Sequence, residues 1–99
     1  MQSFPKTKRI ENQTAIDDVK SMRCLVCDKA PPNDAHHVTT VKAGGNDEPS
    51  NLMNLCRSHH QEIHKFGYGK MIEIYSVVGT WLKVNNRDDI LDRIERAAL

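Results

Sequence analysis

Two segments of the chain are most informative about its fold: AHHVTT at residues 35–40 and NLMNLCRSHHQEIH at residues 51–64. Val and Thr are common in strands, so the first segment predicts a strand over residues 35–41. The second segment predicts another short strand over residues 51–55. Between them, residues 43–49 contain two glycines and a proline, which are typical of a loop. The sequence therefore predicts two short strands joined by a loop.

Helices are expected after the second strand. Residues 57–66 predict a helix that ends at Gly67, because glycine commonly terminates helices. Apolar residues then recur at helical spacing over residues 70–84, with a break expected near Gly79. A last helix is expected over residues 88–98. These C-terminal helices are interpreted as cover for the core, which gives a small α+β domain.

The N-terminal segment, residues 1–13, is polar and predicts a flexible arm before a single domain over residues 14–99. Three basic residues lie close together in this arm: Lys6, Lys8 and Arg9. A solvated tail is the favoured interpretation, and a strap that contacts phosphate is the alternative. Residues 14–22 predict a short helix with Thr14 as its N-cap.

The composition predicts a thin core. Of the 99 residues, 38% are hydrophobic and 5% aromatic, and domains with so little apolar surface commonly need disulfides or a structural metal. Three cysteines cannot all pair with one another. We expect no secretion signal and no membrane-spanning segment, and therefore a reducing, cytoplasmic setting. Cysteine clusters in that setting more often hold metal, so structural zinc is expected.

The net charge of +1 is not that of a strongly basic nucleic-acid-binding domain. Any binding of phosphate must come from local clusters of charge and from a bound cation. Composition alone therefore indicates no function.

The positions of the cysteines and histidines are more informative, because all eight fall between residues 24 and 64. The first group has two pairs with two-residue gaps, Cys24-x-x-Cys27 and Cys56-x-x-His59, separated by 28 residues. Zinc prefers four such ligands in a tetrahedron, and each pair can bind from one turn. A redox pair of Cys24 and Cys27 is the alternative, which the lack of a surrounding βαβ pattern disfavours.

The second group contains His36, His37, Asn51, His60 and His64. His60 and His64 are one helical turn apart and can reach the same point. His36 and His37 are neighbours on an expected strand, where successive side chains face opposite ways, so they are expected to have different roles. A divalent ion bound by three histidines keeps open positions and is typical of a reactive site. An imidazole beside such an ion can accept a proton from water.

These residues resemble the HNH nuclease motif of the ββα-metal fold, over about residues 24–67. The matching segments are AHHVTT and GGNDEPSNLMNLCRSHHQEIH, together with the paired zinc knuckles. The CLVC start and the tryptophan-containing tail are similar to short HNH proteins encoded in phages and prophages. The resemblance implies a ββα-metal motif stabilised by a zinc site of three Cys and one His, with C-terminal helices packed around it.

The resemblance also implies roles for single residues. His37 matches the general base, and His36 lies where the family places a metal ligand. Asn51 matches the middle Asn, which orders the loop between the strands and helps to hold the base. His60 matches the final motif His, a metal ligand, and His64 matches the further histidine that colicin-type members use one turn later.

The zinc-knuckle positions of the family correspond to Cys24, Cys27, Cys56 and His59. His59 departs from the more common Cys at its position. The implied cofactors are a structural Zn²⁺ and a catalytic divalent ion, which is Mg²⁺, Mn²⁺, Ni²⁺ or Zn²⁺. The implied activity is hydrolysis of phosphodiester bonds in DNA, expected to be double-stranded, by nicking or cutting, with one metal ion. Phage packaging or recombination proteins are the implied partners.

Basic residues near the motif are candidates for contacts with the DNA backbone. They are Lys42, Arg57, Lys65 and Lys70. Two other functions stay open. A zinc-ribbon module without catalytic activity, which binds nucleic acid or a protein, is the alternative from another class, and a nuclease that acts on RNA would use the same chemistry.

Overall fold

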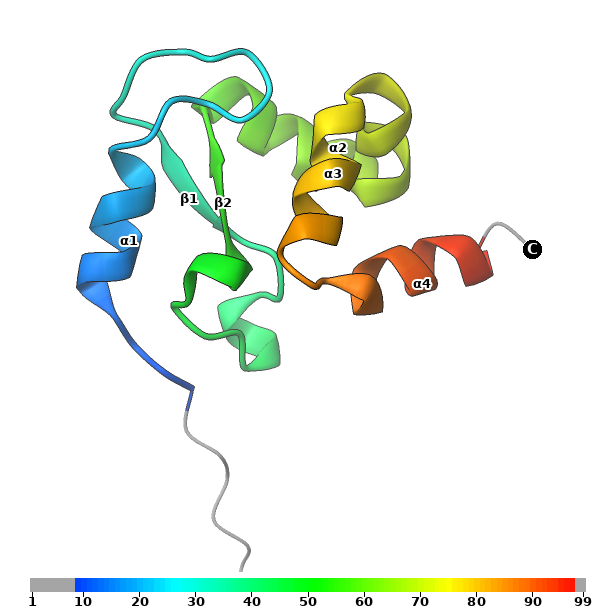
Figure 1. The fold of residues 1–99 in the computed structure, drawn as a ribbon, viewed down its shortest axis with the longest axis horizontal. Helices are drawn as coiled ribbons and strands as arrows, with labels where there is room; N and C mark the ends of the chain where they lie inside the picture. The colour runs from blue at the N-terminus through cyan, green and yellow to red at the C-terminus, as the bar shows by residue number, and fades with distance from the viewer. Residues whose placement is uncertain (1–8, 98–99) are drawn as a thin grey trace, which may run out of the picture.

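The computed structural model describes residues 9–97 of the chain. A small antiparallel sheet lies at the centre, with one helix on one side and three helices on the other (Figure 1). The elements are α1 (Gln13–Lys20), β1 (Asp34–His37), β2 (Leu52–Leu55), α2 (Arg57–Ile74), α3 (Ser76–Val84) and α4 (Asp88–Ala97). Two short 3₁₀ helices, η1 (Val41–Ala43) and η2 (Pro49–Asn51), lie in the connection between the strands. The chain is therefore α+β, as expected.

The two strands place their apolar side chains in two different clusters. In β2, Met53 and Leu55 join the cluster that α2, α3 and α4 cover, whereas Leu52 packs with α1. This alternation follows from the pleat, which sends successive side chains to opposite faces. The register pairs His36 with Met53 and His37 with Leu52, so the two histidines also belong to different faces.

Both strands are shorter than the sequence predicts. The strand expected over residues 35–41 ends at His37, because the side chain of Asn51 takes the backbone N–H and C=O of Thr39 and folds the chain into a loop. The second strand begins at Leu52, since the residues before it form η2, which starts at a proline.

Helix α1 has a different N-cap from the predicted Thr14. The side chain of Asn12 accepts a hydrogen bond from the backbone N–H of Ala15, at 3.1 Å, and the helix begins at Gln13. Asn caps helices at least as well as Thr, so the earlier residue takes the role. Ala15 and Val19 then face Leu52 of the sheet.

The breaks among the C-terminal helices are partly as predicted. Gly67 interrupts α2 with φ 81° and ψ 171°, which confirms that the first helical segment ends there. The next break is at Tyr75, and the expected break at Gly79 is wrong. Gly79 lies inside α3, where a Cβ atom would stand 3.2 Å from Cγ2 of Ile72, so this glycine permits close packing of α3 on α2.

One buried cluster contains two of the three cysteines together with residues of the helices. Cys24 and Cys56 lie in it with Met53, Met71 and Leu82, each no more than 3% exposed. Two of the three cysteines therefore form part of the core, whereas Cys27 is exposed. Within residues 9–97, none of the helices has the length and apolar character that crossing a membrane requires.

Candidate metal centres and active site

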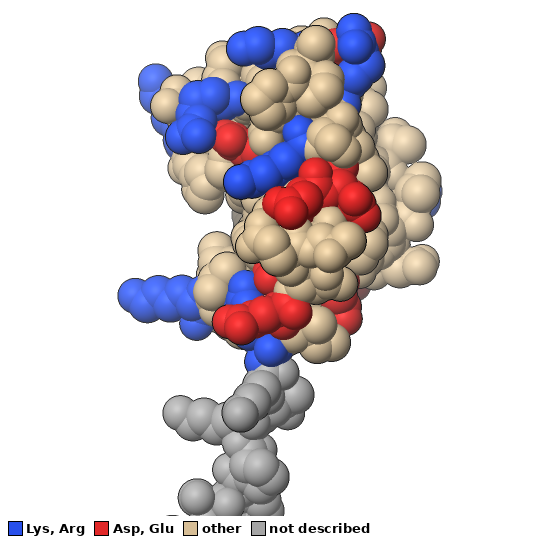
Figure 2. Space-filling model, turned by 90° about the vertical axis from the view of Figure 1, so that its left-hand side faces the viewer, with Lys and Arg blue, Asp and Glu red and all other residues tan. Residues whose placement is uncertain are grey.

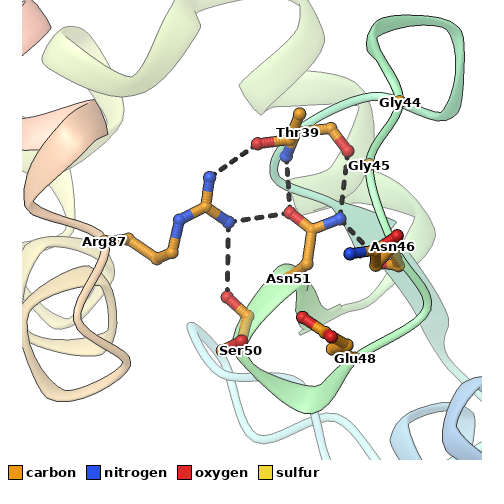
Figure 3. Close-up of a pocket in the computed structure, with 8 residues that line it drawn as sticks. All are labelled: Thr39, Gly44, Gly45, Asn46, Glu48, Ser50, Asn51 and Arg87. Carbon is orange, nitrogen blue, oxygen red and sulfur yellow. Dashed lines mark hydrogen bonds between the residues drawn. The ribbon is translucent and has the colours of Figure 1, made fainter. Parts of the chain in front are cut away.

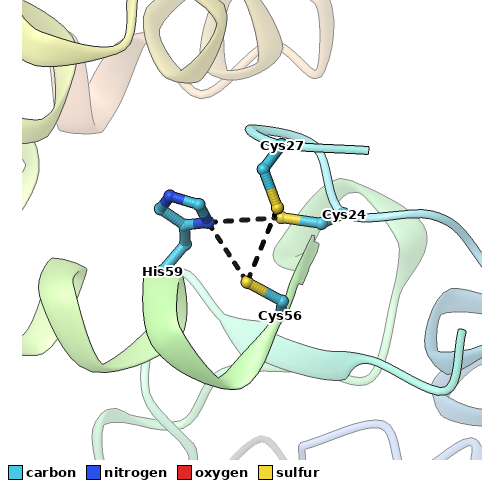
Figure 4. A group of neighbouring side chains, drawn as sticks. All are labelled: Cys24, Cys27, Cys56 and His59. Atoms are coloured by element: carbon cyan, nitrogen blue, oxygen red, sulfur yellow. Dashed lines mark hydrogen bonds between the residues drawn. The ribbon is translucent and has the colours of Figure 1, made fainter. Parts of the chain in front are cut away.

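The four residues of the first group converge at one point beside the N-terminus of α2 (Figure 4). Cys24 and Cys27 come from the turn before β1, while Cys56 and His59 come from the N-cap and first turn of α2. Sγ of Cys27 lies 3.8 Å from Sγ of Cys56, and Nδ1 of His59 lies 3.7 Å from Sγ of Cys24 and 3.1 Å from Sγ of Cys56.

These separations fit a tetrahedral metal site. Zinc–sulfur bonds of about 2.3 Å place two thiolates about 3.8 Å apart, and a thiolate and an imidazole about 3.5 Å apart. Burial raises the pKa of the Cys24 thiol, but hydrogen bonds from the backbone N–H groups of Cys27, Cys56 and Val26 outweigh it and lower that pKa to about 6. The thiolate that a metal needs is therefore favoured at neutral pH.

The second group brings three histidines together from β1 and α2. The ring centroids of His36, His60 and His64 lie 4.9–5.1 Å apart, and one nitrogen of each ring lies within 4.8 Å of the others. Nε2 of His60 is 3.2 Å from Nε2 of His64. Two ring nitrogens bound to one ion stand about 3.0–3.4 Å apart when each lies about 2.1 Å from it. The donor set therefore fits a divalent cation.

Neighbouring side chains orient two of these rings. Nδ1–H of His60 donates to Oδ2 of Asp34 at 2.9 Å, which leaves its Nε2 with the lone pair. The hydroxyl of Tyr68 donates to the carbonyl of Val38 at 3.2 Å, so its oxygen can accept from Nε2–H of His36 at 2.7 Å. Such partners fix the tautomer of a metal-binding histidine and its orientation.

His36 is also held in its neutral form. Its side chain is buried, and burial together with the nearby rings of His60, His64 and His37 lowers its pKa to about 3. A neutral imidazole is the form that binds a metal ion.

His37 belongs to the opposite face of β1 from His36, and its ring contacts a loop residue. Its Nε2 lies 2.7 Å from Oδ1 of Asp47, whose side chain is 4% exposed. Within residues 9–97, no hydrogen-bond partner contacts Nδ1 of His37. Even so, His36, His37, His60 and His64 line one open cavity of about 210 Å³.

Asn51 fastens the loop between the strands, as Figure 3 shows. Its Oδ1 accepts from the backbone N–H of Thr39 at 2.7 Å, and its Nδ2 donates to the carbonyls of Thr39 and Asn46 at 3.0 and 2.9 Å. Gly45 is required at its position, because a Cβ atom there would overlap the carbonyl oxygen of Thr39. The loop that carries Asp47 is therefore closely fitted.

Arg87, between α3 and α4, completes this arrangement. Its guanidinium donates to Oδ1 of Asn51 at 2.7 Å, to Oγ1 of Thr39 at 2.6 Å and to the carbonyl of Ser50 at 3.3 Å (Figure 3). The C-terminal helices are thereby joined to the loop beside the histidines.

Comparison with known proteins decides the family. The model of the family described as "Putative HNHc nuclease" (HNHc_6) matches residues 3–94. The chain belongs to this HNH nuclease family. It is also 32% identical over 54 residues to a protein named anaredoxin from Nostoc sp., and the match covers 54% of this chain and 71% of that protein. No solved structure matches the chain significantly.

The family assignment supports the ββα-metal fold, whose two strands and helix correspond here to β1, β2 and the first part of α2. The structure brings His36, His60 and His64 together, and it places His37 and Asn51 on the strand and loop beside them.

The four basic residues predicted to contact DNA lie in different surroundings. Arg57 contacts Asp34, next to His60, through a nitrogen–oxygen distance of 3.1 Å. Lys65 lies over the ring of Phe66, and Lys70 pairs with Glu73 at 3.6 Å. Lys42 is exposed on η1. On the α1 side of the molecule, other residues and acidic side chains separate the basic ones, so this side carries no continuous basic surface among the described residues (Figure 2).

Sequence reasoning missed four residues that hold the site: Asp34, Asp47, Tyr68 and Arg87. Asp34 is two residues before His36, a spacing that places both side chains on one face of a strand, which was the one available signal. The contacts of the other three join residues 10 to 48 positions apart, and no local pattern marks them.

Arg9 and Asn12, in the segment expected to be a flexible arm, contact Asp47. Lys6 and Lys8 of that segment lie outside the described residues.

Proposed function

We propose that this protein is a metal-dependent HNH endonuclease that hydrolyses phosphodiester bonds in DNA. The observation that carries the proposal is the shared cavity, which His37 lines together with three histidines whose nitrogens can meet at one ion. In this proposal His36, His60 and His64 bind the catalytic divalent ion, and His37 is the general base.

The residues of the cavity divide the chemistry between them. The ion, when bound, supplies positive charge that polarises a phosphoryl oxygen and stabilises the leaving oxyanion. Nδ1 of His37 takes a proton from water as the water oxygen forms a bond to phosphorus. The bond from phosphorus to the leaving oxygen breaks, and that oxygen takes a proton from solvent. Asn51 keeps the loop closed against the strand that carries His37.

We further propose that the site of three cysteines and one histidine binds structural zinc. Cys24 and Cys56 lie in the main core cluster, so a bound metal joins the turn before β1 to the start of α2. Both strands are only four residues long, and a metal site of this kind contributes directly to the free energy of folding.

DNA is the proposed substrate, and Arg57 is the basic residue best placed to contact its backbone. Its guanidinium lies beside Asp34, which in turn contacts His60, and its side chain is 74% exposed. A phosphate held there would lie next to the cavity.

The test is a plasmid-nicking assay of the zinc-loaded protein with added Mg²⁺ or Mn²⁺, beside His37→Ala and His64→Ala. Loss of a general base lowers the rate by about 10²- to 10⁴-fold, so His37→Ala is expected to be almost inactive. Equal nicking by the wild type and His37→Ala would refute the role of His37. Absence of nicking by the wild type with either metal would favour the binding module without catalytic activity.

The choice of DNA over RNA as substrate is tested by a digest that contains labelled DNA and labelled RNA together. We expect the DNA to be cut first, and preferential loss of the RNA would refute the choice of substrate.

A further inference from the structure

Asp47 is the centre of a buried set of contacts beside the candidate active site. Its Oδ1 accepts from Nε2 of His37 at 2.7 Å and from the guanidinium of Arg9 at 2.8 Å. Its Oδ2 accepts from the backbone N–H of Asn12 at 2.9 Å, and its own N–H donates to the carbonyl of Ile10 at 2.8 Å. With its side chain 4% exposed, this carboxylate has a fixed position.

The charge of Asp47 determines which nitrogen of His37 carries the proton. The hydrogen bond from His37, together with that from Asn12, lowers the pKa of the Asp47 carboxyl below its ordinary value. An ionised carboxylate can only accept hydrogen bonds. Nε2 of His37 must therefore carry a hydrogen, and the lone pair of the neutral ring is on Nδ1.

We propose, on the basis of the function proposed above, that Asp47 is a positioning residue that fixes the ring and the tautomer of His37 so that Nδ1 is the base. A carboxylate that accepts from one nitrogen of an imidazole leaves the opposite nitrogen to accept the proton of water. Asp47 acts on the reaction only through His37.

The alternative role for Asp47 is to attach the N-terminal segment, since Arg9 and Asn12 both donate to it. Arg9→Gln separates the two roles, because it removes the second side-chain contact of the carboxylate and leaves the acceptor for His37. Asp47→Asn also keeps an acceptor. Arg9 and His37 both donate to Oδ1, so the amide oxygen is expected there, with the amide nitrogen facing Asn12.

The decisive measurement is the tautomer of His37 in the full-length, zinc-loaded, ¹⁵N-labelled protein. Long-range ¹H–¹⁵N correlation spectra distinguish a protonated from an unprotonated ring nitrogen, and His37→Ala identifies the signals. We expect Nδ1 of His37 to be unprotonated in the wild type, Asp47→Asn and Arg9→Gln. In Asp47→Ala we expect a mixture of tautomers. Asp18→Ala, which removes an exposed carboxylate from α1, is the matched control and should retain the wild-type spectrum.

Nicking kinetics provide the second readout. Asp47→Ala is expected to lower kcat about 10²-fold with KM unchanged, because the base is misplaced while the DNA contacts remain. Asp47→Asn should recover kcat to within about tenfold of the wild type. If Asp47→Ala does not fold, as its amide spectrum would show, Asp47→Leu and Asp47→Ser are measured in its place, and Asp47→Asn and Arg9→Gln still report on the tautomer.

Two results would overturn the proposal: a single wild-type tautomer in Asp47→Ala or its substitutes, or equal loss of that tautomer in Arg9→Gln and Asp47→Ala. The second result would assign Asp47 to attachment of the N-terminal segment. If the wild type does not cut DNA and Asp47→Ala still loses the single tautomer of His37, the nuclease function is refuted and the positioning role is retained.

Discussion

Replacing Arg87 by methionine removes the link between the C-terminal helices and the loop beside the histidines. The guanidinium makes two short hydrogen bonds, at 2.7 Å to Asn51 and 2.6 Å to Thr39, and a longer one of 3.3 Å to Ser50. Its side chain is 13% exposed, so these bonds are largely protected from water, whereas its partner Asp89 is 53% exposed and that ion pair adds little.

The expected loss of stability follows from these contacts. A hydrogen bond from a charged donor contributes about 1.5 kcal/mol at the lower end of its range, so the two short bonds amount to about 3 kcal/mol. Methionine keeps the apolar stem of the side chain and offsets part of this, which leaves about 2–3 kcal/mol. For a domain of this size such a loss lowers Tm by about 10–20 °C.

The assay is urea unfolding of the zinc-loaded protein, followed by circular dichroism, with zinc content measured in each sample. Arg87→Lys is the matched variant. Its free energy of unfolding should lie between those of the wild type and Arg87→Met, because a lysine can make one of these bonds but cannot span all three oxygens. Nicking activity should also fall in Arg87→Met, because the loop that Arg87 holds carries Asp47, which contacts His37. A free energy of unfolding for Arg87→Met within about 0.5 kcal/mol of the wild type would refute this reasoning.

Three further predictions concern the metal sites and the loop. Cys27→Ser, or removal of zinc by a chelator, should abolish the cooperative unfolding transition. The reason is that the binding free energy of structural zinc is about as large as the free energy of unfolding of a whole domain. A zinc-free protein that circular dichroism shows to be folded would contradict this. Gly45→Ala should destabilise the protein by more than about 2 kcal/mol in urea, since its Cβ would meet a main-chain carbonyl oxygen, whereas Gly69→Ala, with a nearest contact of 3.5 Å, should have no such effect. Asp34→Ala should weaken binding of Ni²⁺ or Zn²⁺ at the histidine site about 10- to 100-fold in calorimetry, because Nδ1 of His60 loses its acceptor; unchanged affinity would show that the contact does not orient the ring.

Much of the architecture follows from local sequence. The strand-forming segment at 35–40, the helix after residue 56 and its end at Gly67 are set by side chains a few residues apart. The spacing of His60 and His64 places both rings on one face of the helix, one turn apart, and the alternation along the strand places the side chains of His36 and His37 on opposite faces. Errors arise where tertiary contacts compete with propensity. The first strand ends early because Asn51 forms hydrogen bonds with the backbone N–H and C=O of Thr39. Gly79 does not end a helix but allows α3 to pack closely on Ile72 of α2.

The candidate metal ligands can be recognised from the chain alone, because the two-residue gaps of the cysteine pairs and the four-residue spacing of His60 and His64 are local features. The contacts that hold those side chains depend on the folded chain: Asp34 contacts His60, Tyr68 contacts His36, Asp47 contacts His37, and Arg87 spans the loop. Each of these hydrogen bonds joins segments that burial of the core brings together. The packing of helices and loops determines which residues form these hydrogen bonds, and no short-range sequence pattern predicts that packing.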